Sequence, residues 1–383
     1  IGDGASFGGR GTHSSYNYST TNINQILAYD KEFGENHNLS AKLGHEYYLY
    51  TDKYLAGQKT NFFDPANPEL SNGGALQDLT SYTNKHNIEG FFGMADYNYA
   101  SRYYFSAAFR RDGTSRFLDK WGNFWSAGAA WRISHEPFMQ NASGWLNDLK
   151  LRASYGTQGN ENILPGYDYA YTPYTDQYAV TWDGAKLGYS YVFYGNPELT
   201  WEKQNTFDVG LDFRFIDRIY GSIDWFYRKT DDMLFQRPLP ESTGRPYKWD
   251  NIGSMENTGI EFELNFDILK KQDLQWTVSV VGSHYANKIL TLPEENKELA
   301  ITSGLLNLRE GKSRYEYYTY KYAGMGDKGQ PSWYMDEVDE EGNPTGNIIT
   351  TEDYTKATKY FLGKEALPDF NGGLNMNFYW KGI

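Results

Sequence analysis

The clearest pattern in the chain is a strict alternation of apolar and polar residues between positions 206 and 227. Apolar side chains occupy every second position from Phe207 to Phe215, and the alternation resumes from Ile219 to Tyr227 after Ile216-Asp217-Arg218. Because successive side chains of a β-strand point to opposite faces, each run has one apolar face and one polar face. The pattern therefore predicts two antiparallel strands joined by a tight turn.

The same alternation recurs along the chain and predicts about eleven strands. The alternating runs cover residues 27–33, 39–49, 93–99, 103–109, 125–133, 149–155, 207–215, 219–227, 260–268, 274–280 and 372–380. An ordinary strand has about five or six residues, whereas a tilted strand needs roughly 9 to 11 residues to cross a bilayer. The longer runs therefore favour strands that cross a membrane.

The connections between these runs alternate between a few residues and tens of residues. Long loops are expected near 53–85, 156–200, 235–250 and 291–358, where Gly, Pro and Asn interrupt the pattern. Antiparallel strands that cross a membrane emerge alternately on its two sides, and outer-membrane barrels have short periplasmic turns and long extracellular loops. The predicted fold class is all-β, a transmembrane antiparallel β-barrel, with long loops on the extracellular side.

Composition supports a β-rich chain and excludes several function classes. The 383 residues are 39% hydrophobic and 17% aromatic, with 34 tyrosines, 39 glycines and no cysteine. No window holds 18 consecutive apolar residues, so no transmembrane helix is predicted. The net charge of −13 provides no basic field for phosphates, so no nucleic-acid partner is expected.

Several motifs resemble the C-terminal barrel half of the SusC/RagA family of TonB-dependent outer-membrane transporters. The matching segments, in chain order, are residues 111–117, 130–134, 136–139, 147–156, 196–203, 251–259, 321–324 and 367–373. They read RDGTSRF, AWRIS, EPFM, NDLKLRASYG, NPELTWEK, NIGSMENTG, KYAG and LPDFNGG. The resemblance extends over essentially the whole chain.

The resemblance implies a barrel of roughly 22 strands that encloses an N-terminal plug. Residues 1–383 are then expected to be the C-terminal portion of the barrel, without the plug and the TonB-binding segment. The implied function is TonB-dependent import of a large nutrient, a glycan or a peptide. The implied partners are the TonB complex, a SusD-like surface lipoprotein and outer-membrane lipid, in a Gram-negative bacterium of the Bacteroidetes type. No cofactor is implied.

Aromatic side chains in the long loops are the predicted substrate contacts, because rings can stack on sugars or pack against peptide side chains. Packing of the same rings against other loops or against the lipoprotein is the alternative for each of them. The candidates are Tyr174, Tyr178, Trp182, Tyr191, Trp249 and Tyr317. The acidic segment 336–343 is a weaker candidate for calcium, through Asp336, Asp339 and Glu341, but it lacks the spacing of an EF-hand. A solvated hairpin tip is the preferred interpretation, so no metal site is predicted.

Three other functions remain open at this point. A passive outer-membrane porin or a soluble β-rich glycan-binding module would have similar alternation and polar turns. An enzyme is disfavoured because the six histidines show no HExxH spacing and the chain has no GxSxG segment.

Overall fold

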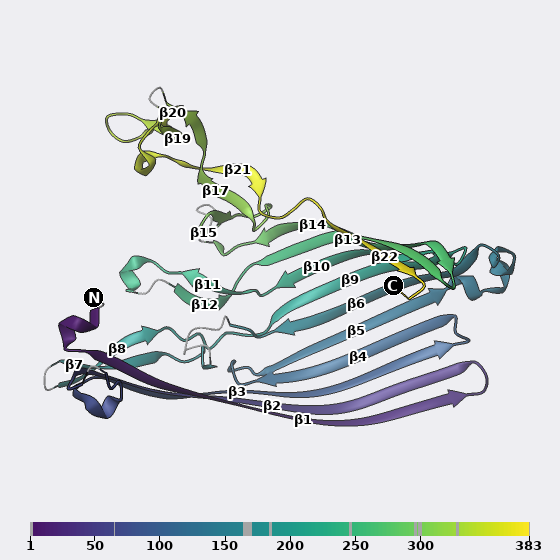
Figure 1. Cartoon of the computed structure of the whole chain (residues 1–383), viewed down its shortest axis with the longest axis horizontal. Coiled ribbons are helices and arrows are strands. Elements are labelled where there is room, and N and C mark those ends of the chain that lie inside the picture. Colours follow the sequence, from purple (N-terminus) through teal and green to yellow (C-terminus); the bar gives the residue numbers. More distant parts are fainter. Residues whose placement is uncertain are drawn as a thin grey trace.

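Eleven strands form one continuous antiparallel sheet in the computed structural model, which describes residues 3–64, 66–163, 171–183, 186–244, 247–294, 297, 301–326 and 329–382. Each strand pairs with its neighbour in chain order, and β1 and β22 are the two edges (Figure 1). The strands are β1 (Arg10–Phe33), β2 (His37–Phe62), β3 (Gly73–Tyr99), β4 (Tyr103–Thr114), β5 (Trp121–Arg132), β6 (Leu146–Asn160), β9 (Glu202–Phe215), β10 (Ile219–Asp231), β13 (Ser254–Lys271), β14 (Leu274–Thr291) and β22 (Asn371–Trp380). The predicted all-β class and the predicted number of strands are confirmed.

The register of the sheet aligns the apolar positions of all strands on one face. One row of paired positions across four strands illustrates this. Leu43 of β2 pairs with Gly93 of β3, Gly93 pairs with Phe109 of β4, and Phe109 pairs with Trp125 of β5. Many of these outer side chains are exposed, including Leu43, Phe109 and Trp125. A continuous exposed apolar face is what lipid covers in a transmembrane barrel. We call it the outer face and the opposite one the inner face.

The connections of the sheet alternate between its two ends (Figure 1). One end, which we call the short end, holds connections of 2 to 13 residues, whereas the other, the long end, holds residues 63–72 and 115–120 and the three longest connections, 161–201, 232–253 and 292–370. The short end holds residues 34–36, 100–102, 133–145, 216–218 and 272–273, of which 133–145 includes the 3-10 helices η3 (Ile133–His135) and η4 (Pro137–Ala142). The turns at Ala100-Ser101 and Ile216-Asp217 have both central residues at positive φ and close with a hydrogen bond from the fourth residue to the first. This is the type I′ geometry that suits the twist of antiparallel strands.

The long connections hold strands of their own. β7 (Gln177–Asp183) pairs with β8 (Lys186–Phe193), and β11 (Leu234–Pro238) pairs with β12 (Tyr247–Asn251). The last connection carries two small sheets, formed by β15 (Ile301–Ser303), β16 (Leu306–Leu308), β17 (Glu316–Tyr320) and β21 (Lys359–Glu365), and by β18 (Tyr322–Met325), β19 (Pro331–Val338) and β20 (Pro344–Thr351). Short 3-10 helices are η1 (Asp3–Phe7), η2 (Leu70–Asn72), η6 (Glu241–Thr243) and η8 (Tyr354–Lys356).

The expected loop at 53–85 is mostly strand, which corrects the prediction. β2 continues to Phe62 and β3 begins at Gly73, so the connection shrinks to residues 63–72. β1 alone has 24 residues, or roughly 80 Å at about 3.3 Å per residue, against a hydrocarbon layer of roughly 30 Å. The outer face turns polar beyond Ile23, Leu49 and Phe91, where Thr21, Thr51 and Glu89 follow on that face. The alternation disappears there because the strands have left the apolar layer.

None of the helices in the described ranges is long and apolar enough to cross a membrane.

Candidate functional site

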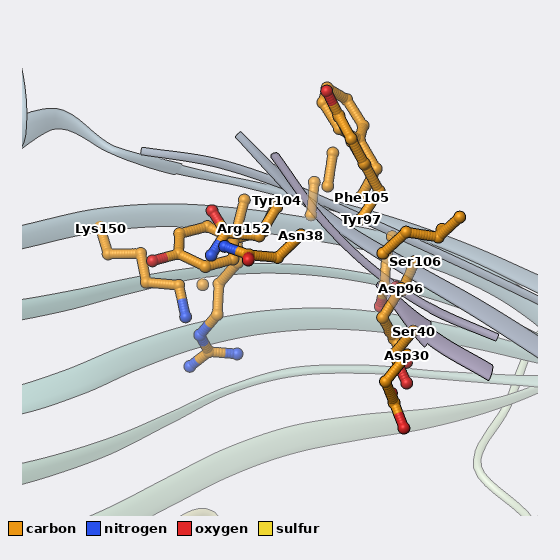
Figure 2. A pocket seen from close by; sticks show the side chains of 18 of the residues that line it. Asp30, Asn38, Ser40, Asp96, Tyr97, Tyr104, Phe105, Ser106, Lys150 and Arg152 are labelled. Atoms are coloured by element: carbon orange, nitrogen blue, oxygen red, sulfur yellow. The ribbon is translucent and has the colours of Figure 1, made fainter. Parts of the chain in front are cut away.

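The inner face forms a groove near the short end of the sheet, with charged and apolar side chains in its lining. The groove has a volume of about 850 Å³ and is lined by residues of β1 to β6 and β9. Figure 2 shows Asp30 and Arg152 on one side of the sheet and the rings of Tyr97 and Phe105 on the other. The alternation read from the sequence thus separates a charged inner wall from an apolar outer wall.

Ion pairs between nearby strands join several charged residues of the inner wall. Arg152 on β6 contacts Asp212 on β9 at 3.0 Å and Asp224 on β10 at 2.8 Å. To reach β10, its side chain crosses β9 at Gly210, which lies opposite both Arg152 and Asp224. A Cβ at Gly210 would overlap the Asp224 carboxylate and the Arg152 guanidinium. Glycine at this position therefore allows the Arg152 side chain on β6 to form ion pairs with carboxylates on both β9 and β10.

A second pairing of this kind holds the wall at β2 and β4. The Arg110 guanidinium donates to Asp112 on the same strand at 2.6 Å and to Glu46 on β2 at 2.8 Å. These pairs lie on the inner face, away from lipid. The guanidinium groups of Arg110 and Arg152 are therefore both engaged in ion pairs along the wall.

Two of the motifs that carry the family resemblance contribute to a packed base beneath the long loops. Phe117 from the RDGTSRF motif and Trp201 from the NPELTWEK motif are buried in one apolar cluster. The cluster also contains Phe124, Ile163, Phe193, Leu199 and Trp249. Trp201 donates its indole N–H to the Lys120 carbonyl at 3.0 Å. These motifs position the loops rather than form a reactive centre.

Two asparagine side chains form hydrogen bonds that join two long connections at this base. The Asn196 side chain donates to the Trp249 carbonyl and to the Asp250 carboxylate, both at 3.0 Å. The Asn251 side chain accepts from the Thr200 amide at 2.8 Å and donates to the Thr200 carbonyl at 2.9 Å. Connections 161–201 and 232–253, which are distant in sequence, are fixed to each other by these bonds.

Trp249 belongs to this base, which corrects its expected role as a substrate contact. Its side chain is only 4% exposed and packs within the apolar cluster. A ring buried in this way has no face left for a ligand. The sequence could place Trp249 in a loop but not on the buried side of β12.

The other predicted contacts lie in separate parts of the loops. Tyr178 and Tyr191 face each other on β7 and β8, with ring centroids 4.9 Å apart, and Tyr191 also contacts Tyr194. Tyr178 is 57% exposed, whereas Tyr174 is half-buried. Tyr317 is half-buried in the small sheet of β15, β16, β17 and β21.

Trp182 lies in β7, where its backbone pairs with that of Leu187. Its side chain is outside the described residues.

Asp176 supports the Tyr178 and Tyr191 pair at the start of β7. Burial and a hydrogen bond to Asp176 raise the pKa of Tyr191 above its usual value. The same hydrogen bond and the Gly195 amide lower the pKa of the Asp176 carboxyl. The phenol therefore stays neutral and the carboxylate stays charged near neutral pH, which fixes this hairpin to the loop that follows it.

The three carboxylates proposed for calcium do not converge. Asp336 accepts a hydrogen bond from Tyr360 at 2.6 Å, whereas Asp339 accepts from the amides of Glu341 and Asn343 at the tip of the β19–β20 hairpin. These backbone bonds lower the pKa of the Asp339 carboxyl. Within the described ranges, no three His, Asp or Glu side chains are grouped as a metal site. Asp339 is therefore held at the hairpin tip by the backbone amides of its own turn.

Glu161 fixes the beginning of the connection 161–201 to the inner wall. Its carboxylate contacts His86 on β3 at 3.0 Å and accepts a hydrogen bond from the hydroxyl of Thr114. Burial alone would raise the pKa of Glu161, but His86, Arg116 and Thr114 outweigh it and the net pKa is lowered. The charged carboxylate therefore anchors the loop to β3 and to the RDGTSRF motif.

One group of aromatic residues is not among the contacts expected from the sequence. Tyr16, Tyr18, Tyr50, Tyr54 and Tyr82 lie on the inner face of β1, β2 and β3, beyond the apolar layer. The spacing of two residues between Tyr16 and Tyr18 was the sequence feature that could have indicated this group. It did not do so because residues 53–85, which include the partner of Tyr16 on β2, were expected to form a loop.

The fold and its two faces define a segment of a transmembrane β-barrel wall. The chain belongs to the TonB-dependent receptor family: residues 2–382 match the family described as "TonB dependent receptor-like, beta-barrel". The resemblance to the SusC/RagA group is confirmed, and these proteins reside in the bacterial outer membrane.

Two curated relatives illustrate the match. TonB-dependent receptor P3 of Formosa agariphila is 32% identical over 99% of this chain and 39% of its own length. TonB-dependent receptor SusC of Bacteroides thetaiotaomicron is 30% identical over 90% of this chain and 34% of its own length. The chain therefore spans less than two fifths of the length of either relative.

Solved structures have a similar fold. The RagAB peptide importer in its closed-closed state superposes with a TM-score of 0.83 at 27% identity, over 97% of this chain and 41% of that chain. The outer-membrane transporter YddB of Escherichia coli shares the fold, with a TM-score of 0.51 at 12% identity over 96% of this chain and 41% of that chain.

Proposed function

We propose that the complete protein actively imports a large nutrient, a glycan or a peptide, across the outer membrane and that the TonB complex drives this import. The observation that carries the proposal is the match of residues 2–382 to the TonB-dependent receptor barrel family. A charged inner wall with a groove of about 850 Å³ and long aromatic connections at one end suit passage and capture of a large polar molecule. Similarity to RagAB, which is a peptide importer, supports the peptide alternative.

The chain is proposed to be the C-terminal portion of a closed barrel. β1 and β22 each have an unpaired edge, and unpaired backbone groups in lipid cost several kcal/mol each. The relatives are more than twice as long as their matched regions, which leaves length for further strands and a plug. The additional strands would pair with β1 and β22.

A SusD-like lipoprotein is the proposed partner on the long-loop side. The support is the similarity to SusC and an exposed apolar face on the β7–β8 hairpin. Tyr178, Val180, Leu187 and Tyr189 lie on that face and are at least half exposed. Such a surface gains stability when another protein covers it.

Tyr174, Tyr178, Trp182, Tyr191 and Tyr317 are proposed as loop contacts to substrate or to the lipoprotein. Substitution of Tyr178 by Ala would lower capture of substrate in the first case. In the second case it would release the lipoprotein without changing the affinity of the isolated transporter.

The test uses the complete transporter in its own host. Material that co-purifies with the transporter is identified by mass spectrometry, labelled, and offered to cells with and without TonB activity. The proposal expects uptake to fall to background without TonB. Unchanged uptake would identify a passive porin, and release of hydrolysis products by the purified protein would identify an enzyme.

A further inference from the structure

We propose that the inner-face tyrosines of β1, β2 and β3 form a binding platform for a neutral carbohydrate at the mouth of the barrel. The platform consists of Tyr16, Tyr18, Tyr50, Tyr54 and Tyr82, joined by Tyr171 from the connection 161–201. The inference rests on the proposed import function and specifies a site and a ligand class for it.

The platform lies outside the membrane and faces the same way as the inner groove. Side chains at even positions of β1 and β2 lie on the inner face from Asp30 and Ser40, which line the groove, to Tyr18 and Tyr50. The strand pairing has no shift over this range. The outer faces of the same segments carry polar residues such as Asn17, Lys53 and Lys85, together with the exposed Leu55 and Leu79. A ligand that enters the barrel from the long-loop side therefore passes these tyrosines first.

The tyrosine rings form one connected aromatic surface. Tyr16 and Tyr18 have planes within 4° of parallel and centroids 6.1 Å apart. Tyr16 contacts Tyr54 at 4.4 Å, Tyr54 contacts Tyr82 at 5.1 Å, and Tyr18 approaches Tyr50 at 6.5 Å. Tyr16 is 54% exposed and Tyr18 is 62% exposed. Two nearly parallel, half-exposed rings present flat apolar area to a ligand.

Tyr171 shows that an incoming group can be accommodated at this surface. Its ring lies parallel to Tyr50, with an interplanar angle of 2° and centroids 6.4 Å apart. Its hydroxyl donates to the Asp52 carboxylate at 3.2 Å. A flat ring with a hydroxyl, stacked on one tyrosine and bonded to the neighbouring carboxylate, has the recognition chemistry of a sugar ring. Tyr171 thus makes, at one position of the platform, two contacts that a sugar would make: stacking on Tyr50 and a hydrogen bond to Asp52.

Asp52 provides an acceptor within the platform. It lies between Tyr50 and Tyr54 on β2 and is only 7% exposed. Its Oδ2 accepts from the Asn84 side chain and from Tyr171, but its buried Oδ1 has no hydrogen-bond partner among the described residues. A buried carboxylate oxygen without a partner is costly, and a ligand hydroxyl that reached it would relieve that cost.

The charges of the platform select a neutral ligand. On the inner face of segments 12–22, 48–58 and 78–86, the charged residues are Asp52 and Asp78, whereas no Lys or Arg is present. Uronate, sulfate or phosphate groups would meet carboxylates without a compensating cation. Pyranose rings offer apolar C–H faces for the tyrosines and hydroxyl donors for Asp52. This combination favours a neutral glycan over an anionic glycan or an acidic peptide.

The test measures binding by the complete transporter, purified in detergent and labelled, to an array of neutral glycans, uronate-containing glycans and peptides. The double variant Tyr16→Ala/Tyr18→Ala should lower affinity for the neutral glycan that the wild type binds by about tenfold or more. Tyr16→Phe/Tyr18→Phe keeps the rings and should keep most of the affinity. Ser15→Ala/Asn17→Ala changes the same strand on its outer face and should have no effect.

Three results would overturn the inference: binding to no neutral glycan, binding to peptides or anionic glycans alone, or equal affinity of the Ala and wild-type proteins. Heat-modifiable mobility on gels verifies that each variant has assembled. TonB-dependent uptake is measured separately. If the variants show unchanged binding and normal uptake, the platform is rejected and the import function stands. If uptake does not depend on TonB, the import function alone is rejected.

Discussion

Glu161 connects the long loop 161–201 to the barrel wall through three side chains. Its carboxylate contacts His86, Thr114 and Arg116, which come from β3, from β4 and from the segment after β4. Its pKa is lowered in the folded protein despite burial. Its contribution to stability is therefore fully present above the usual Glu pKa near 4.5 and is lost as the pH falls through the lowered value.

Replacing Glu161 by Gln tests this anchor. At pH 7 the free energy of local opening of the loop should fall by about 1.5–3 kcal/mol, the range for a hydrogen bond to a charged group. The difference between wild type and variant should shrink as the pH falls below about 4.5, because the wild-type carboxyl is then protonated too. Hydrogen exchange of residues 171–183, corrected for intrinsic rates, measures it. The exposed Glu198 of the same loop is the control as Glu198→Gln, and a difference that is constant with pH would contradict the role of Glu161.

Ile216 occupies a backbone conformation that β-branched residues rarely adopt. Its φ is 47° in the type I′ turn, and its side chain is exposed. The left-handed region costs an ordinary L-residue about 1–2 kcal/mol, and Asn tolerates it best after Gly. Ile216→Asn should therefore stabilise the β9–β10 hairpin by about 1 kcal/mol, measured as a higher unfolding midpoint in urea. Glu35→Asn, in a turn position without positive φ, should leave the midpoint unchanged. A lower midpoint for Ile216→Asn would show that its side chain has a role elsewhere.

At the level of elements, the two faces of each strand meet different surroundings. Ile223 and Ser222 are neighbours on β10, where Ile223 lies opposite Leu211 on the outer face and Ser222 lies opposite Asp212 on the inner face. Ser222 also pairs with Glu263 of β13. A lysine at Ser222 would have carboxylates nearby, whereas a lysine at Ile223 would face lipid.

Ile223→Lys should therefore impair assembly, with a cost of about 2–4 kcal/mol near the middle of the bilayer, and Ser222→Lys should be nearly neutral. The measurement is the fraction of heat-modifiable, folded protein in outer-membrane preparations. Equal assembly of the two variants would contradict the assignment of the faces.

Sequence periodicity predicted the elements well where the strands face lipid. The runs around Phe207 and Ile260 alternate strictly because one side must be apolar and the other hydrated, and these runs became β9 and β13. Above the apolar layer both faces are polar, so the extensions of β2 and β3 looked like a loop. Tyr16 and Tyr18 were missed as a site for the same reason. Trp249 was misplaced because its burial depends on Asn196 and Phe117, which are distant in the sequence.

At the scale of the molecule, the sheet has two unlike ends. The short end has tight turns and two 3-10 helices held by Glu136, which accepts hydrogen bonds from Arg102 and Trp131, both at 3.0 Å. The long end has small sheets, the buried base and the tyrosine platform. If the chain is the wall of an import barrel, the long end faces the surroundings of the cell and the short end faces the periplasm.

Site-directed labelling of cysteines tests this orientation most directly, because the chain has no cysteine of its own. Phe63 at the long end is 94% exposed, and Asp217 at the short end is also exposed. In the complete transporter, Phe63→Cys should react with a large, membrane-impermeant maleimide on intact cells. Asp217→Cys should react only after the outer membrane is permeabilised, and the unsubstituted transporter provides the background. Reaction of Asp217→Cys on intact cells at the rate of Phe63→Cys would contradict the assignment of the chain as a transmembrane wall with its long connections outside the cell.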